Sequence, residues 1–126
     1  MLLGRDVAIR SSGRRGRGLY ALRDLEEGEL IGRYRGQILS DDEYQSSSST
    51  GVYAMQLPNG RVIDGEDEGR SSFLRYMNHS KRLANCVACE ETFFSGMLAS
   101  VHIETTQPVS KGDELLFEFA FLVFEP

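Results

Sequence analysis

Three small polar residues, Asn78-His79-Ser80, stand together in the middle of the chain behind an apolar and aromatic lead-in. The amide of Asn78 can donate and accept hydrogen bonds, and His79 offers two ring nitrogens. Such groups, anchored by buried aromatic residues, suit a polar, planar ligand. Two ordinary alternatives stay open. A lone histidine is more often part of a satisfied interior, and Asn-x-Ser is also the N-glycosylation acceptor sequence.

A glycine-rich turn near the start of the chain is the second stretch that could contact a ligand. Residues 12–18 read Ser-Gly-Arg-Arg-Gly-Arg-Gly. Glycine at positions 16 and 18 lets the backbone approach a ligand closely. A phosphate-binding loop fits poorly, because no Gly-Lys-Ser/Thr follows. Three arginines in one turn keep an Arg-Gly nucleic-acid motif open as an alternative.

The two cysteines of the chain, Cys86 and Cys89, have the spacing of half a zinc site. Because the chain has no second cysteine pair, we expect no zinc and assign no metal ligands. Cys86 is expected to be a small buried apolar residue instead. The low cysteine content also suits a reducing compartment.

Short strands separated by turns are expected to position these residues. The sequence Pro58-Asn59-Gly60 predicts a hairpin, and the capping-box spacing of residues 40–43 predicts the start of a short helix. No helix of twelve residues is indicated, so the fold is expected to be mostly β. Apolar and alternating segments predict strands at residues 7–10, 19–22, 30–34, 52–57, 61–64, 98–105 and 114–119.

The alternation of side chains predicts the faces of two strands. Leu30 and Tyr34 should share one face of the strand at 30–34. Ile31 and Arg33 should share the other face. In the last strand, the residues expected on one face are Leu115, Phe117 and Phe119.

The length of 126 residues allows one core, so we expect a single domain over residues 1–126. No apolar run approaches the ~20 residues of a membrane span. The opening Met-Leu-Leu-Gly is too short for a signal peptide and is followed by charge. The expected location is therefore nuclear or cytoplasmic, and the glycosylation alternative for Asn78 falls away.

The net charge of −5 is spread unevenly along the chain. Residues 1–35 hold eight arginines and five acidic residues, a balance of +3, whereas residues 36–126 hold six basic and fourteen acidic residues, a balance of −8. The acidic part argues against direct nucleic-acid binding and fits a basic peptide as partner. A solvated acidic face without a partner is the commoner origin of such a balance.

Five motifs in order resemble the SET domain of protein lysine methyltransferases. The family's glycine-x-glycine turn corresponds to Gly16-Arg17-Gly18, and its Arg-aromatic-x-Asn-His-Ser corresponds to residues 75–80. Its Gly-Glu-Glu-Leu, followed by an aromatic residue and Asp-Tyr, corresponds to residues 112–119. Tyr34-Arg35-Gly36 is similar to the family's Tyr-x-Gly, and residues 62–65 are similar to its Val-Ile-Asp-Ala. The resemblance covers nearly the whole chain.

Within the family, the sequence most resembles the histone lysine monomethyltransferase subgroup, through residues 49–53, 78–81 and 84–86. The resemblance implies a SET fold of several small β-sheets, whose C-terminal strand passes under a loop as a pseudoknot. Such threading is unusual among proteins. The implied function is methyl transfer from S-adenosylmethionine to lysine side chains of proteins. Histone tails are the expected substrates, and chromatin regulation is the expected role.

The resemblance also implies which residues hold the cofactor. The backbone of the glycine turn should hold the methionine and ribose side, and one aromatic ring should line the same pocket. The amide of Asn78 and the imidazole of His79 should meet the adenine and amino-acid ends of the cofactor. These cofactor-binding residues are Arg15, Gly16, Arg17, Tyr53, Asn78 and His79.

The substrate lysine is expected to enter from the opposite side, through an aromatic channel formed by the catalytic residues Tyr34, Phe117 and Phe119. A free lysine has a pKa near 10.4, so its neutral form costs roughly 4 kcal/mol at pH 7.4 unless an apolar channel lowers that pKa. In the family, a tyrosine at this position restricts the enzyme to one round of methylation. The phenylalanine at 117 therefore implies room for di- or trimethylation. Core packing is the commoner role of such aromatic residues, and only the resemblance raises these three above it.

Two departures from the family pattern affect the expected activity. The family's Asp-Tyr is Glu118-Phe119 here, so a hydroxyl that orients the amine is missing and Tyr34 is left to supply one. Loss of such a donor costs about 10²–10³ in rate in comparable sites. The alternative function is therefore a SET-fold binding module with weak or no catalysis. The chain also ends about where the family usually adds a segment that closes the channel. Either the substrate or a second copy in a homodimer is expected to complete the site, or the site stays open.

Overall fold

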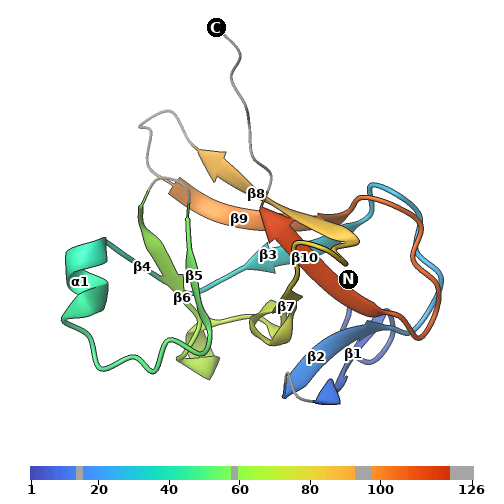
Figure 1. The fold of residues 1–126 in the computed structure, drawn as a ribbon, viewed down its shortest axis with the longest axis horizontal. Coiled ribbons are helices and arrows are strands. Elements are labelled where there is room, and N and C mark those ends of the chain that lie inside the picture. The colour runs from blue at the N-terminus through green and yellow to red at the C-terminus, as the bar shows by residue number, and fades with distance from the viewer. Residues whose placement is uncertain (14–15, 58–59, 93–97, 120–126) are drawn as a thin grey trace, which may run out of the picture.

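The computed structural model describes residues 1–13, 16–57, 60–92 and 98–119, and of residues 90–92, 98–100 and 119 only the backbone. Two β-sheets form the framework of this part of the chain (Figure 1). No helix in it is long and apolar enough to cross a membrane.

The larger sheet carries most of the predicted motifs. Its strands are β1 (Val7–Ser11), β2 (Arg17–Ala21), β3 (Leu30–Tyr34), β7 (Asn78–His79), β8 (Cys86–Thr92), β9 (Leu98–Thr105) and β10 (Glu114–Phe119). They follow the order β1-β2-β10-β8-β9-β3, and β7 pairs separately with β10. The last strand of the chain therefore lies in the middle of the sheet, as Figure 1 shows.

The smaller sheet has the order β4-β6-β5 and is accompanied by short helices. Its strands are β4 (Gln37–Leu39), β5 (Ala54–Gln56) and β6 (Val62–Asp64), and the helices are α1 (Asp41–Gln45) and the 3₁₀ helices η2 (Glu68–Arg70) and η3 (Phe73–Tyr76). The predicted hairpin is confirmed by the antiparallel pairing of β5 and β6, although Pro58 and Asn59 of its turn lie outside the described residues. The predicted capping box is confirmed at Ser40 and Glu43, whose side chains each accept a hydrogen bond from the other's backbone N–H.

Both sheets contribute to one hydrophobic core. Ile63 of the smaller sheet and Leu74 of η3 are fully buried in the same cluster as side chains of the larger sheet. The largest of those are Leu19, Ile31, Ile103 and Leu115. Because the core is shared, the position of the smaller sheet is fixed by packing against the larger one.

Strand β8 was not predicted, and its composition explains why. Cys86 and Ala88 are each 1% exposed and alternate with the half-buried Val87 and Cys89. The period of two is present, but the buried face consists of small residues rather than large apolar ones. The prediction that Cys86 is a small buried residue is confirmed.

The predicted faces of β3 are wrong at its beginning. Leu30 is 46% exposed, whereas Ile31 is fully buried and Tyr34 is 4% exposed. The cause is an irregularity in the pairing of β3 with β9, between Leu30 and Gly32. An extra residue at such a bulge exchanges the two faces of a strand, so Leu30 turns outward while Tyr34 keeps its buried position.

Strand β10 has the environment expected of the pseudoknot. It pairs antiparallel with β2 and parallel with both β7 and β8. These two parallel partners flank the loop of residues 80–85. The backbone N–H of Ser80 donates to the Phe117 carbonyl at 3.0 Å, and that of Asn85 donates to the Leu116 carbonyl at 3.0 Å. The loop is thus bonded to β10 at both of its ends.

The side chain of Asn85 adds two more bonds to β10. Its Nδ2 donates to the Glu114 carbonyl at 2.9 Å, and its Oδ1 accepts from the Leu116 N–H at 2.9 Å. Asn85 is only 8% exposed, so these peptide groups have little access to water and depend on the amide. Asn85 therefore fixes the strand that carries Phe117.

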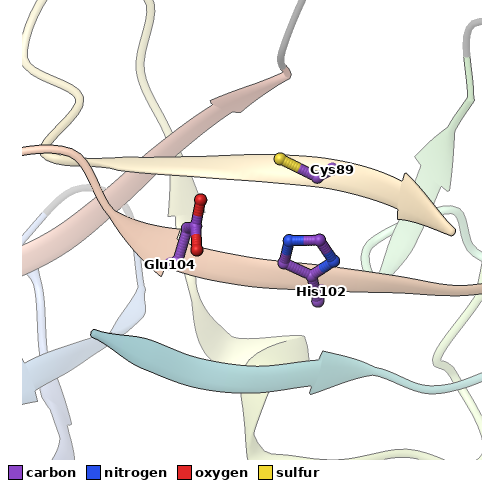
Figure 2. Close-up of side chains that lie close together, drawn as sticks. All are labelled: Cys89, His102 and Glu104. Carbon is purple, nitrogen blue, oxygen red and sulfur yellow. The ribbon is translucent and has the colours of Figure 1, made fainter. Parts of the chain in front are cut away.

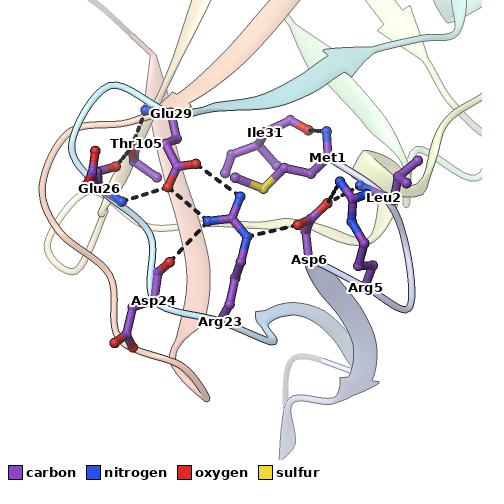
Figure 3. Close-up of polar contacts among 10 residues, drawn as sticks. All are labelled: Met1, Leu2, Arg5, Asp6, Arg23, Asp24, Glu26, Glu29, Ile31 and Thr105. Carbon is purple, nitrogen blue, oxygen red and sulfur yellow. Dashed lines mark hydrogen bonds and ion pairs between the residues drawn. The ribbon is translucent and has the colours of Figure 1, made fainter.

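A network of charged side chains ties Asp6, just before β1, to the segment between β2 and β3 (Figure 3). The Nε of Arg23 donates to Asp6 Oδ1 at 2.9 Å, and its Nη2 donates to Glu29 Oε1 at 3.0 Å. Asp6 Oδ2 also accepts from the Leu2 N–H at 2.7 Å. The side chain of Asp6 is 4% exposed, whereas that of Arg23 is 44% exposed. Arg23, together with Arg5, whose Nη2 lies 3.2 Å from Asp6 Oδ2, thus supplies positive charge beside an almost buried carboxylate.

The hydrogen bonds of this network lower the pKa of both carboxyl groups. The pKa of Asp6 is lowered most by the hydrogen bond from the Leu2 N–H and next by the one from Arg23. The pKa of Glu29 is lowered most by Arg23 and next by the Glu26 N–H. A carboxyl group with a lower pKa in the folded state stabilises the fold above its unfolded pKa of about 4. That contribution is lost as the pH falls through the folded pKa.

Asp6→Asn is expected to lower the melting temperature at pH 7 by about 5–10 °C, because it removes the charge that Arg23 and the Leu2 N–H stabilise. It should also flatten the fall of melting temperature below about pH 4. Thermal scans between pH 3 and 7 measure both effects. Glu27→Gln, an exposed carboxylate in the neighbouring loop, is the matched control. Equal pH dependence in Asp6→Asn and the parent protein would contradict this role.

Candidate functional site

Two cavities adjoin one another between the larger and smaller sheets. The Phe117 cavity has a volume of about 330 Å³, and the residues particular to it include Tyr34, Met55, His79 and Phe117. The Gly16 cavity has a volume of about 590 Å³, and the residues particular to it are Gly16, Arg17, Glu68 and Tyr76. The residues that line both cavities are Val52, Tyr53, Arg75, Met77 and Asn78.

Arg75 organises the shared wall. Its Nε donates to the Gly65 carbonyl at 2.8 Å, and its Nη2 donates to the Glu66 carbonyl at 2.8 Å. Its Nη1 donates to the Tyr76 hydroxyl at 3.0 Å, and its guanidinium carbon lies 3.7 Å from the centre of the Tyr53 ring. One side chain therefore binds the loop after β6 and also orients two aromatic rings.

The Gly16 cavity combines aromatic surface with positive charge. The rings of Tyr53 and Tyr76 meet edge to face, with centroids 5.8 Å apart. The guanidinium carbon of Arg17 lies 5.5 Å from the centre of the Tyr76 ring. Such a surface suits a ligand with a planar ring and an anionic group.

The two glycines of the turn are required for different reasons. Gly16 has φ +77°, in the left-handed region that favours glycine, and open space lies above its Cα. A side chain at Gly18 would instead collide with the Glu114 carboxylate and would reach the Cβ of Ser12 at 3.1 Å. Gly16 lines a cavity and so has open space for a ligand, whereas Gly18 packs against β10. Arg15 lies outside the described residues.

Asn78 joins the glycine turn to β10. Its Nδ2 donates to the Arg17 carbonyl at 3.0 Å and to Glu114 Oε2 at 2.8 Å. The other oxygen of Glu114 accepts from the Ser12 hydroxyl at 2.8 Å. Both amide hydrogens of Asn78 are therefore used within the protein, and the acceptor Oδ1 is the group that it can offer to a ligand.

His79 and Arg17 line different cavities. His79 is exposed and lines the Phe117 cavity, and its ring meets the Phe117 ring edge to face at 5.5 Å. The structure thus groups His79 with Tyr34 and Phe117, whereas Asn78 borders both cavities.

Tyr34 has a nearly buried phenol. Its residue is 4% exposed, and its hydroxyl donates to the carbonyl of Tyr53. Burial raises the pKa of Tyr34 to about 12, so the phenol stays neutral at physiological pH. Phe117 is 5% exposed and lines the same cavity. Phe119 is described by its backbone alone, which pairs with Ala88.

A match to a known family accounts for this arrangement. The sequence model of the SET domain matches residues 16–120. The chain belongs to the SET-domain family.

Relatives of this SET domain include much longer proteins. Histone-lysine N-methyltransferase SETD2 of Mus musculus is 32% identical over 123 residues, which cover 92% of this chain and 5% of that protein. Histone-lysine N-methyltransferase 2D of Homo sapiens is 30% identical over 122 residues, which cover 92% of this chain and 2% of that protein. The chain therefore spans only a small part of the length of these relatives.

Solved structures support the same fold. The structure of Arabidopsis thaliana SUVH6 in complex with SAM (S-adenosylmethionine) matches with a TM-score of 0.78 at 20% identity, covering 89% of this chain and 28% of that one. The methyltransferase domain of human PR domain-containing protein 2 matches with a TM-score of 0.67 at 20% identity, covering 96% of this chain and 81% of that one. The predicted SET fold is thereby confirmed.

The two cysteines of the SET domain lie on opposite faces of β8. Cys86 points into the core, where burial raises the pKa of its thiol to about 12. Cys89 is half-buried, and its pKa is raised by burial first and by Glu104 second. Residues three apart in a strand point to opposite sides, so the two thiols cannot bind one metal ion.

The sequence motifs contained two further residues of the site without marking them out. Arg75 belongs to the motif at residues 75–80, and Glu114 belongs to the motif at residues 112–119. Only the structure shows that Arg75 holds Tyr53 in place and that Glu114 holds Asn78. The charge of Arg75 and Glu114 was the feature of the sequence that could have indicated a role. A charged side chain is rarely buried without a partner. The identity of that partner depends on the fold.

Proposed function

We propose that this SET domain transfers a methyl group from S-adenosylmethionine to the lysine side chain of a protein. The observation that carries the proposal is the pair of cavities that share the wall formed by Tyr53, Met77 and Asn78. Direct transfer between two bound reactants requires that they approach one another in line. Two adjoining cavities that share these lining residues would allow that approach.

The Gly16 cavity fits the cofactor. Its volume of about 590 Å³ lies within the range of roughly 300–1,000 Å³ typical of ligand pockets. Arg17 would pair with the cofactor's carboxylate and Glu68 with its amino group. The faces of Tyr53 and Tyr76 would hold its planar and cationic parts. When bound, the cofactor supplies a methyl group activated by a sulfonium.

The Phe117 cavity would receive the lysine. The rings of Tyr34 and Phe117 in its lining favour the neutral amine, because burial disfavours the charged form. The lysine proton is released to solvent before transfer, since Tyr34 is itself a neutral phenol with a pKa of about 12. The Tyr34 hydrogen is donated to Tyr53, so its oxygen can accept a hydrogen bond from the amine. Tyr34 thus orients the nucleophile and does not act as a base.

A histone tail is the substrate class that we propose. Both relatives above are named histone-lysine N-methyltransferases, and the net charge of −8 over residues 36–126 suits a basic peptide. Action on histones would place the protein in the nucleus. Phe117 leaves more room beside the amine than a tyrosine would, which favours more than one round of methylation.

A SET-fold binding module is the second candidate function. Phenylalanine at position 119, where the family has tyrosine, favours it. Radiolabelled methyl transfer to mixed histones separates the two functions, because a binding module would hold cofactor without producing labelled protein.

Asn78→Ala is expected to weaken S-adenosylmethionine binding by about 1–3 kcal/mol, or roughly 5- to 150-fold, whereas His79→Ala, which alters the neighbouring Phe117 cavity, should weaken it less. Asn78→Ala also releases the Arg17 carbonyl, so its effect should be the larger. Calorimetric titration measures both affinities, and Gln107→Ala, in an exposed loop, is the control. Parent-like affinity in folded variants would overturn the cofactor assignment.

Phe119→Tyr is expected to raise methyl transfer about tenfold or more, because one well-placed hydrogen bond is worth ~1.4 kcal/mol or above. Cofactor affinity should barely change, since the family resemblance implies that the added hydroxyl would face the amine. Single-turnover assays with a histone-tail peptide measure the rate. If transfer falls, or if only stability changes, position 119 belongs to the core and the proposed channel is misplaced.

Tyr34→Phe is expected to lower transfer at least tenfold while leaving the shape of its pH profile unchanged. Between pH 7 and 10 the rate should rise as lysine loses its proton, and Tyr34 should add no inflection because burial keeps its pKa near 12. Single-turnover rates across this range test both statements. A midpoint that moves in Tyr34→Phe would show that the phenol exchanges a proton with the substrate.

A further inference from the structure

A cysteine, a histidine and a glutamate gather on the face of the β8–β9 pair that points away from the core. Figure 2 shows Cys89 on β8 and His102 and Glu104 beside one another on β9. A sulfur, a ring nitrogen and a carboxylate oxygen of these residues all lie within 4.8 Å of one another. We propose that the three residues bind a divalent metal ion, and that Zn²⁺ is the ion they suit best.

The register of the sheet brings these side chains together. Cys89 pairs directly with His102, and Val87 pairs with Glu104. Directly opposed residues on an antiparallel pair have Cβ atoms about 4.5–5.5 Å apart. On β9, the residues that alternate with His102 and Glu104 are Val101 and Ile103, which are fully buried. Packing therefore fixes the outward direction of both ligands before a metal binds.

The ligand types match zinc. Thiolate, imidazole and carboxylate are the three groups that bind Zn²⁺ in proteins, and three protein ligands leave the fourth tetrahedral position to water. The thiolate and carboxylate carry two negative charges, which balance the ion. On binding, the Cys89 thiol transfers its proton to solvent, so no other reactant is needed.

The distances require only a small adjustment. Zinc–ligand bonds of about 2.0–2.3 Å place ligand atoms roughly 3.4–3.8 Å apart around one ion. A contraction of about 1 Å from the present spacing is within reach of side-chain rotation, because all three side chains are half-buried. Arg33 of β3, which is exposed and pairs with His102, is the nearby positive charge that opposes binding. The affinity is therefore lower than that of a four-cysteine structural site.

This site is separate from the methyl-transfer site. None of the three residues lines the Phe117 or Gly16 cavity. The metal would connect β8 to β9, and β8 pairs with the strand that carries Phe117. Its direct effect is thus on the stability of the sheet. The proposal replaces the expectation of no zinc, which rested on the spacing of cysteines and could not include His102 or Glu104.

The test uses untagged protein freed of metal with a chelator and titrated with Co²⁺, whose spectrum reports a bound thiolate. We expect one ion per chain, a thiolate-to-cobalt charge-transfer band, displacement by Zn²⁺, and a higher melting temperature with Zn²⁺. Cys89→Ser should abolish the band. His102→Gln and Glu104→Gln should each weaken affinity at least tenfold.

Cys86→Ala and His79→Ala are the matched controls, because they alter the other cysteine and the other histidine of the chain. Both variants should keep the thiolate-to-cobalt band and the metal affinity of the parent protein. Glu104→Gln alters a half-buried carboxylate on the outer face, so it keeps the test valid if another variant fails to fold. Absence of a thiolate band in the parent protein overturns the proposal. So does a band that survives Cys89→Ser, or parent-like affinity in Glu104→Gln.

Discussion

The two hydrogen bonds between the Asn85 side chain and the backbone of β10 are the interaction on which the site depends. They satisfy a buried N–H and a buried carbonyl on either side of Leu115, and so fix the last strand between segments distant in sequence. With β10 held there, Glu114 reaches Asn78 and Ser12, and Phe117 meets His79. The glycine turn and the motifs at residues 75–80 and 112–119 are thereby brought into contact, although 62 positions separate Gly16 from Asn78 in the chain.

The sequence predicted the motifs better than it predicted the contacts among them. Strand β3 and the last two strands lie where the sequence patterns placed them, because their alternation involves large apolar residues. Strand β8 was missed because its buried face consists of Cys86 and Ala88. The bulge in β3 was also missed, since one extra residue in a pairing leaves no mark on the composition of the strand itself.

Candidate site residues could be predicted only where a motif named them. The two roles of Asn78, bonding to Arg17 and bordering both cavities, depend on long-range pairing that spacing does not encode. The cluster of Cys89, His102 and Glu104 has the same origin, because thirteen positions separate Cys89 from His102 in the chain while the sheet sets them directly opposite one another. Cross-strand register, rather than local pattern, is what sequence analysis lacked.

Tyr53 is one of the residues that line both cavities. Its ring forms part of the Gly16 cavity, and its carbonyl accepts the hydrogen bond from Tyr34 in the Phe117 cavity. A ligand that moves the Tyr53 backbone from one side would therefore also move the acceptor of the Tyr34 hydrogen bond on the other side. Binding in the two cavities would then be coupled, and by thermodynamic reciprocity each ligand would change the affinity of the other by the same factor.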